Sequence, residues 1–290
     1  MDPRKTPERS PLRGEPPPKT HLDRSTPLHV EVVSIGRELL RGRIADDNAP
    51  KLAEKLTRRG ALVHRITVVD DSSRAIASAL SEALARGAHL IVTSGGLGPG
   101  SDDRTLDAIA SALTRPLTMH AGARRMVETA YRRLHEKRLV SLEGLNAARE
   151  KMCSIPVGAE PILNAVGAVP GILVRLSGGG TVLALPGLPE EAQAVLDEAL
   201  SQLRDLFAQR HLARREVETA TRDESVLGPL LDQLGEEFPA VAVQCQVPGF
   251  GRKDARITVN LEASGPTRGE AELMVEGALR RLIELAGGKR

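Results

Sequence analysis

The chain has 290 residues, of which 40 are Lys or Arg and 38 are Asp or Glu, so its formal net charge is +2 at pH 7. Hydrophobic residues make up 41% of the chain but aromatic residues only 1%, so the core must be aliphatic. The scarcity of aromatic side chains excludes the stacking platforms that bind single-stranded nucleic acid.

Residues 1–27 differ in composition from the rest of the chain. They hold seven of the 19 prolines, together with six basic and four acidic side chains. Such a segment buries too little apolar surface to fold, so we expect a disordered tail. The tail accounts for the whole net charge, which leaves the rest near neutral and argues against nucleic acid as a partner.

The sequence shows no means of entering a membrane. No stretch reaches the roughly 18 consecutive apolar residues that a transmembrane helix needs. The first residues also lack the apolar centre of a secretory signal. We therefore expect a soluble, cytoplasmic protein without a membrane partner.

From Leu28 onward, short apolar runs alternate with segments whose apolar residues recur at helical spacing. This pattern predicts strands at 28–35, 61–69 and 88–93 and helices at 48–59, 74–86 and 104–113. Strands and helices that alternate in this way form a mostly parallel sheet with helices on both faces. Further along, we expect a helical region at 118–151, strands at 162–166, 172–176 and 181–185, and a closing helix at 186–206.

The pattern changes again from Arg215 onward. Short strands are expected at 216–221, 241–247 and 256–261, interleaved with helices at 225–238 and 267–285. Such a unit is typical of a split βαβ module. We therefore divide the chain into the tail at 1–27, an α/β domain at 28–210 and a smaller α+β domain at 211–290.

A glycine-rich loop follows the third strand and precedes a helix, in the order Ser94-Gly95-Gly96-Leu97-Gly98-Pro99-Gly100-Ser101-Asp102-Asp103. Glycines let the backbone approach a ligand, and the first N–H groups of a helix favour an anion. Asp102 and Asp103 would repel a bare phosphate. We therefore expect a metal ion, a ribose hydroxyl or a ring N–H to stand between these carboxylates and the phosphate. The alternative is that Ser101, Asp102 and Asp103 only cap the following helix.

Two further loops have a similar character. Gly36, Glu38, Asp46 and Asn48 follow the first strand, and residues 186–191 follow a late buried strand. If the strand order is 2-1-3, the first two loops meet at the point where the order reverses, and ligands bind there in open α/β sheets. For residues 186–191, the alternative is a plain helix start with Pro189 in the first turn.

The three loops together resemble the CinA (competence/damage-inducible) family. The resemblance lies in Ile35-Gly36-x-Glu38-Leu39-Leu40-x-Gly42-x3-Asp46-x-Asn48, in Gly95-Gly96-Leu97-Gly98-Pro99-x2-Asp102-Asp103-x-Thr105 and in Pro186-Gly187-x-Pro189-Glu190. It implies a three-layer α/β sandwich of the molybdopterin-binding MoaB/MogA type, followed by the smaller α+β domain. We expect no deamidase activity, because the chain ends before the carboxy-terminal deamidase domain of longer members.

The resemblance implies two functions for the α/β domain. Some relatives hydrolyse the pyrophosphate of ADP-ribose with a divalent metal, and other proteins of the fold bind molybdopterin. Our first hypothesis is a metal-dependent hydrolase of a nucleoside-diphosphate compound, with Asp46, Asp102 and Asp103 as catalytic residues. Asp102 and Asp103 would hold Mg or Co. The expected ligand-binding residues are Gly36, Glu38, Asn48, Ser94, Gly95, Gly96, Leu97, Gly98, Pro186, Gly187 and Glu190.

Two alternatives remain open. The first is a non-catalytic protein that binds molybdopterin or a nucleotide and serves molybdenum cofactor biosynthesis. The second is a scaffold that contacts protein or RNA through the glycine-rich, basic loop at 248–253. In each case we expect a homo-oligomer, most simply a dimer, with a small nucleotide or pterin ligand in the first two.

Overall fold

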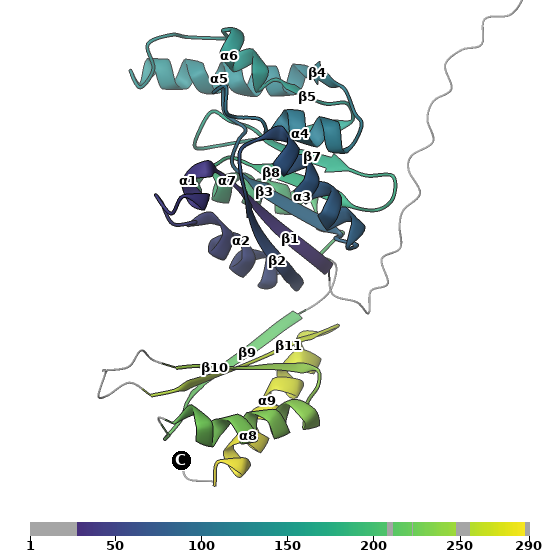
Figure 1. Cartoon of the computed structure of the whole chain (residues 1–290), viewed down its shortest axis with the longest axis vertical. Helices are drawn as coiled ribbons and strands as arrows, with labels where there is room; N and C mark the ends of the chain where they lie inside the picture. Colours follow the sequence, from purple (N-terminus) through teal and green to yellow (C-terminus); the bar gives the residue numbers. More distant parts are fainter. Residues whose placement is uncertain (1–27, 208–210, 222, 248–255, 288–290) are drawn as a thin grey trace, which may run out of the picture.

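The computed structural model describes residues 28–207, 211–221, 223–247 and 256–287 (Figure 1). The expected tail and the basic loop at 248–253 lie outside these described residues. Within them, no helix has both the length and the apolar character needed to cross a membrane.

A six-stranded sheet forms the centre of the larger domain, with strand order β2-β1-β3-β8-β7-β6. Its strands are β1 (Leu28–Ile35), β2 (Ala61–Val69), β3 (Leu90–Ser94), β6 (Ala159–Ile162), β7 (Gly171–Arg175) and β8 (Thr181–Leu185). The pairs β1–β2, β1–β3 and β3–β8 are parallel, whereas β7 pairs antiparallel with both of its neighbours. The predicted order 2-1-3 is therefore confirmed.

Helices cover both faces of this sheet, as Figure 1 shows. One face packs against α3 (Ser73–Ala85), α4 (Thr105–Ala112) and α5 (Ala121–Glu136), and the other against α2 (Asn48–Thr57) and α7 (Pro189–Gln202). Both faces of β1 are buried, with Val33 on the first side and Val32 on the second. A parallel strand buried on both faces is mostly apolar, and β1 follows this pattern except at His29, Glu31 and Ser34. The three-layer α/β sandwich is confirmed.

The helical region predicted over 118–151 is wrong in its extent. Leu117–Met119 forms β4, which pairs antiparallel with β5 (Ser154–Pro156). His120 then caps α5, because its Nδ1 accepts hydrogen bonds from the backbone N–H groups of Gly122 (3.2 Å) and Ala123 (3.3 Å). The chain leaves the helix after Glu136 and becomes helical again only in α6 (Ala147–Lys151).

Two other predicted strands are displaced. The strand expected at 162–166 lies at 159–162 as β6, and the one expected at 216–221 lies at 211–218 as β9. β6 is the edge strand of the sheet and contains Pro161. Proline lacks an N–H donor and is tolerated mainly at such edges. A proline in the sequence therefore argues against a strand, even where an edge strand forms.

The smaller domain is a three-stranded antiparallel sheet with order β10-β11-β9. Its elements are β9 (His211–Glu218), α8 (Glu224–Glu237), β10 (Val241–Gln246), β11 (Thr258–Gly265) and α9 (Arg268–Leu285). β11 alternates buried and half-exposed residues, which is typical of a strand with one covered face. Because β11 lies between β9 and β10, the split βαβ arrangement is confirmed.

Candidate functional site

A cavity of about 790 Å³ opens at the ends of β1, β3 and β8. Three loops and the start of α7 surround it, with Val169 from a fourth segment. The predicted site residues that line it are Glu38, Asp46, Asn48, Ser94, Gly95, Gly96, Leu97, Gly98, Asp103, Pro186 and Gly187. Gly36, Asp102 and Glu190 do not. The volume lies within the usual range for small-molecule sites.

The first loop carries Asp46, which has a structural role beside any role toward a ligand. Its Oδ1 accepts hydrogen bonds from the backbone N–H groups of Asn48 and Ala49, both at 3.0 Å. These bonds satisfy donors at the start of α2 that have no partner inside the helix. The other carboxylate oxygen, Oδ2, is buried without a hydrogen-bond partner within the described chain.

The glycine loop approaches the first loop so closely that a side chain would not fit. Gly95 has φ 106°, and a Cβ built on it would lie 2.5 Å from the carbonyl oxygen of Ile35. Gly96 also has a positive φ, of 69°. Thr105 holds the loop from the helix side, because its hydroxyl donates to the carbonyl of Gly95 at 2.8 Å. The backbone conformation at Gly95 and Gly96 therefore requires glycine.

The capping interpretation of Ser101, Asp102 and Asp103 is wrong. Helix α4 begins at Thr105, after Arg104, and no side chain caps it. Asp103 turns back instead, and its Oδ2 accepts a hydrogen bond from the backbone N–H of Gly100 at 2.8 Å. Asp102 is exposed and outside the cavity. The structure therefore brings Asp103, but not Asp102, to the predicted crevice.

Asn48 joins all three loops. Its Nδ2 donates to the hydroxyl of Ser94 and to the carbonyl of Gly187, both at 2.8 Å. The Ser94 hydroxyl in turn donates to the carbonyl of Pro186 at 3.3 Å. Asn48 and Ser94 are only 8% and 4% exposed, so these bonds form away from solvent. Asn48 is a predicted ligand-binding residue, whereas the structure shows that much of its hydrogen bonding joins the loops.

Glu191 lines the cavity, although the residue predicted to bind the ligand is its neighbour Glu190. Both lie in the first turn of α7, but Glu190 is exposed and Glu191 is half-buried. Burial raises the pKa of Glu191, and a 2.5 Å hydrogen bond from Asn164 Nδ2 opposes this effect only in part. Two adjacent glutamates at a helix start look alike in sequence, so no signal separated them.

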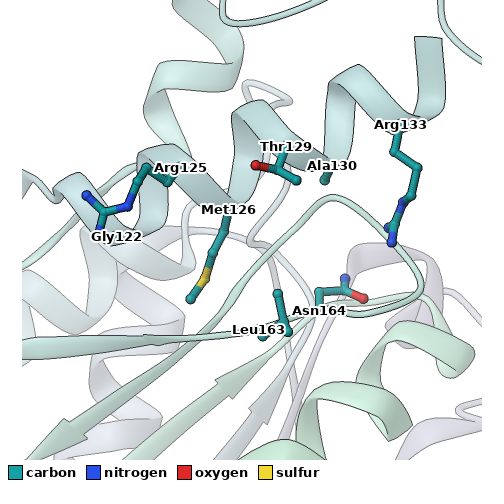
Figure 2. A pocket seen from close by; sticks show the side chains of 8 residues that line it. All are labelled: Gly122, Arg125, Met126, Thr129, Ala130, Arg133, Leu163 and Asn164. Carbon is teal, nitrogen blue, oxygen red and sulfur yellow. The ribbon is translucent and has the colours of Figure 1, made fainter. Parts of the chain in front are cut away.

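A smaller cavity of about 270 Å³ lies under α5 (Figure 2). Met126 points from the helix toward Leu163, and Arg133 extends toward the segment that carries Asn164. Arg133 donates to the carbonyls of Ala165 (2.8 Å) and Gly167 (3.1 Å). Asn164 lines this cavity and Glu191 the larger one, so their hydrogen bond separates the two.

The larger cavity is rich in hydrogen-bond acceptors. Its lining includes the carboxylates of Glu38, Asp46, Asp47, Asp103 and Glu191, and none of its lining residues is Lys, Arg or His. Three polar atoms of lining residues are buried without a partner in the described chain: Ser34 Oγ, Asp46 Oδ2 and Asn48 Oδ1. Buried polar atoms are normally paired, so a ligand that supplies donors would satisfy them.

The carboxylates as they stand do not fit a metal ion. Divalent magnesium prefers several oxygen ligands at short, regular distances. Oδ1 of Asp46 and Oδ2 of Asp103 already accept backbone hydrogen bonds. Among the residues that the structure describes, no group of three or more His, Cys, Asp or Glu side chains is placed to hold an ion.

Residues 31–205 match the family model described as "Probable molybdopterin binding domain". Protein PH0439 of Pyrococcus horikoshii is 36% identical over 222 residues, which cover 77% of this chain and 85% of that protein. Protein TK1472 of Thermococcus kodakarensis is 36% identical over 259 residues, covering 89% and 99%. Among solved structures, the protein CinA with unknown function from Thermoplasma acidophilum is 35% identical. That match covers 61% of this chain and 98% of the other, with a TM-score of 0.54.

Proposed function

The chain belongs to the family of the probable molybdopterin binding domain, with CinA among its relatives, and we propose that its larger cavity binds a pterin that carries a phosphate group. The observation that carries this proposal is the acceptor-rich lining of the cavity, which includes five carboxylates and no Lys, Arg or His. A pterin ring presents several N–H donors, and such donors would pair with the acceptors that line this cavity.

The glycine loop would take the phosphate. The backbone N–H groups of Gly96, Leu97 and Gly98 have no protein acceptor within the described part of the chain. These residues line the cavity, and the carbonyl of Gly96 accepts a hydrogen bond from the backbone N–H of Thr105, the first residue of α4. Free backbone N–H groups near a helix start attract anions. A ligand with donors at one end and a phosphate at the other matches both sides of the cavity.

Metal-dependent hydrolysis of a nucleoside diphosphate such as ADP-ribose is the second candidate. The observation that favours it is the number of carboxylates that line the cavity, because carboxylates could hold a metal ion that activates water for attack on a pyrophosphate. The placement of Asp46 and Asp103 argues against it, since each already binds backbone N–H groups. The divalent ion, Mg or Co, remains part of this second proposal.

Calorimetric titration of the full chain separates the two candidates. A 6-substituted pterin phosphate and ADP-ribose are each added with and without MgCl₂ or CoCl₂, and products are followed by chromatography. We expect the pterin phosphate to bind without metal and ADP-ribose to remain intact. Metal-dependent release of AMP, without pterin binding, would overturn the proposal.

The variant Asp46→Asn sharpens this experiment. The amide keeps an oxygen for the N–H groups of Asn48 and Ala49 but replaces the buried acceptor by a donor. We expect the fold to persist and pterin binding to fall by about tenfold or more, the effect of one lost hydrogen bond of about 1.4 kcal/mol. Asp107→Asn, an exposed acid in the first turn of α4, is the matched control.

A further inference from the structure

We propose that Glu191 selects the ligand by binding a 2-amino-4-oxopyrimidine edge, the donor pair that pterins and guanine share. The proposal rests on the function proposed above and names the group that would read the ring. That edge carries an amino group beside a ring N–H, and a carboxylate accepts both in two parallel, charge-assisted hydrogen bonds. An adenine ring lacks this pair of adjacent donors.

The position of Glu191 is not explained by the helix that carries it. Acidic residues in a first turn interact favourably with the helix dipole while they remain exposed. Glu190 already does so, since it is exposed in the same turn. Glu191 instead turns inward and lines the cavity. A carboxylate buried in this way costs free energy unless partners compensate.

The surrounding segment is shaped around this carboxylate. A Cβ at Gly167 would collide with the Glu191 carboxyl group, so the position admits only glycine without rearrangement. Asn164 is 6% exposed and donates to Glu191 Oε2 at 2.5 Å and to the carbonyl of Val169 at 2.9 Å. Its Oδ1 accepts from the N–H of Gly167 at 2.8 Å. Asn164 is therefore fully engaged and fixes where Glu191 stands.

The carboxylate lacks a cationic partner on the side of the cavity. None of the residues that line the cavity is Lys, Arg or His. Burial raises the pKa of Glu191, with the hydrogen bonds from Asn164 and the Val169 backbone acting in the opposite direction. A ligand that presents two N–H donors would supply the missing compensation, because hydrogen bonds to an ionised group are stronger than neutral ones.

A purely structural role is the competing explanation. Glu191 would then only join α7 to residues 164–169 through Asn164. Gln at this position would fill that role equally well, since its carbonyl oxygen also accepts from Asn164. Gln cannot accept two hydrogen bonds from neighbouring donors, because one of its terminal atoms is itself a donor. Glu191→Gln therefore separates a structural role from ligand recognition.

The experiment measures affinity by calorimetry for two matched pairs of ligands. GMP and IMP differ only in the 2-amino group, and pterin and lumazine differ at the same ring position. We expect the wild-type chain to prefer GMP over IMP and pterin over lumazine by about tenfold or more. In Glu191→Gln both preferences should fall to within about twofold, whereas Glu190→Gln should leave them unchanged.

The outcomes distinguish this proposal from the previous one. Equal affinity of the wild-type chain for both members of each pair would overturn the role of Glu191 while leaving pterin binding intact. A preference for GMP over IMP without any pterin binding would support the recognition role of Glu191. It would also show that the recognised ring is guanine and not a pterin. Binding of none of the four ligands would overturn both proposals. Undiminished preferences in Glu191→Gln would also overturn the role of Glu191, and the wild-type comparison can still overturn it if Glu191→Gln fails to fold.

Discussion

Asp46 and Asp103 lie in loops that follow different strands, yet both line the same cavity. Each carboxylate has one oxygen bound to backbone N–H groups of its own loop, Asp46 at the start of α2 and Asp103 at Gly100. Each acid therefore helps to fix the shape of its loop and also contributes negative charge to the cavity lining. Their structural and chemical roles can be separated, because Asn preserves the shape of Asp.

Asp103→Asn is expected to leave the fold intact. The amide oxygen can still accept from the N–H of Gly100, so the free energy of unfolding should change by less than about 1 kcal/mol. If the hydrolase candidate is correct, metal-dependent turnover of ADP-ribose disappears in this variant. Asp102→Asn is the comparison, since Asp102 is exposed outside the cavity. A large loss of stability on urea unfolding of Asp103→Asn would show that the charge itself maintains the loop.

Asn48→Ala should destabilise the chain by roughly 2–3 kcal/mol, because two buried hydrogen bonds are lost and the Gly187 carbonyl loses its donor. Ligand binding should be lost with it, since the three loops are no longer joined. Asn146→Ala is a matched control outside the cavity lining: it removes the cap of α6 and should cost about 1 kcal/mol. Equal effects of the two variants on ligand affinity would contradict the role given to Asn48.

Gly95→Ala and Gly187→Ala form a second matched pair. Gly95 combines φ 106° with a Cβ position 2.5 Å from a backbone oxygen, so Ala should cost at least about 1 kcal/mol. The nearest atom to a Cβ on Gly187 lies 3.5 Å away, an ordinary contact. Its substitution should change stability by less than about 0.5 kcal/mol. Thermal unfolding measures the stability of both variants. A Gly95→Ala variant as stable as the wild type would mean that the glycine loop can move away from Ile35 at the end of β1.

The pH dependence of stability should report on Glu31, a 2% exposed residue in the middle of β1 that does not line the cavity. Arg86 donates to its Oε1 (2.9 Å) and Oε2 (2.7 Å), and these bonds hold the pKa of Glu31 below its usual value of 4.5. The lowered pKa means that ionised Glu31 stabilises the fold above pH 4.5, and that this contribution is lost as the pH falls through the folded-state pKa.

Arg86→Met should reverse that dependence. A buried carboxylate without its partner disfavours ionisation, so the variant should be least stable near neutral pH and recover as the pH falls. The double variant Glu31→Gln/Arg86→Met should be more stable than the single one at pH 7. Urea unfolding between pH 4 and 7 measures all three proteins. If Arg86→Met were as stable as the double variant at pH 7, the stabilising role of Arg86 toward ionised Glu31 would be refuted.

The sheet could be predicted from the sequence because both of its faces are buried. Strands such as β3 and β8 are then largely apolar runs, and the helices α2 and α3 show a clear apolar stripe. The region 118–151 could not be resolved in this way. Its boundaries depend on the pairing of β4 with β5, which joins residues far apart in the sequence.

The candidate site was predicted in its loops but not in its side-chain roles. Asp103 and Asp102 are adjacent, and only the return of the chain toward Gly100 places one of them in the cavity. Glu191 differs from Glu190 only through its packing against Gly167, a contact across the fold. The divalent metal, the homo-oligomer and the cytoplasmic location stay predictions.

Asn48 has a kinetic consequence. Because the side-chain amide of Asn48 already joins the three loops, the cavity lining keeps its shape before any ligand binds. Association then loses little conformational entropy to loop ordering, and more of the interaction energy remains as affinity. Rapid-mixing traces should accordingly show a single phase whose rate rises linearly with ligand concentration, without a slow isomerisation afterwards.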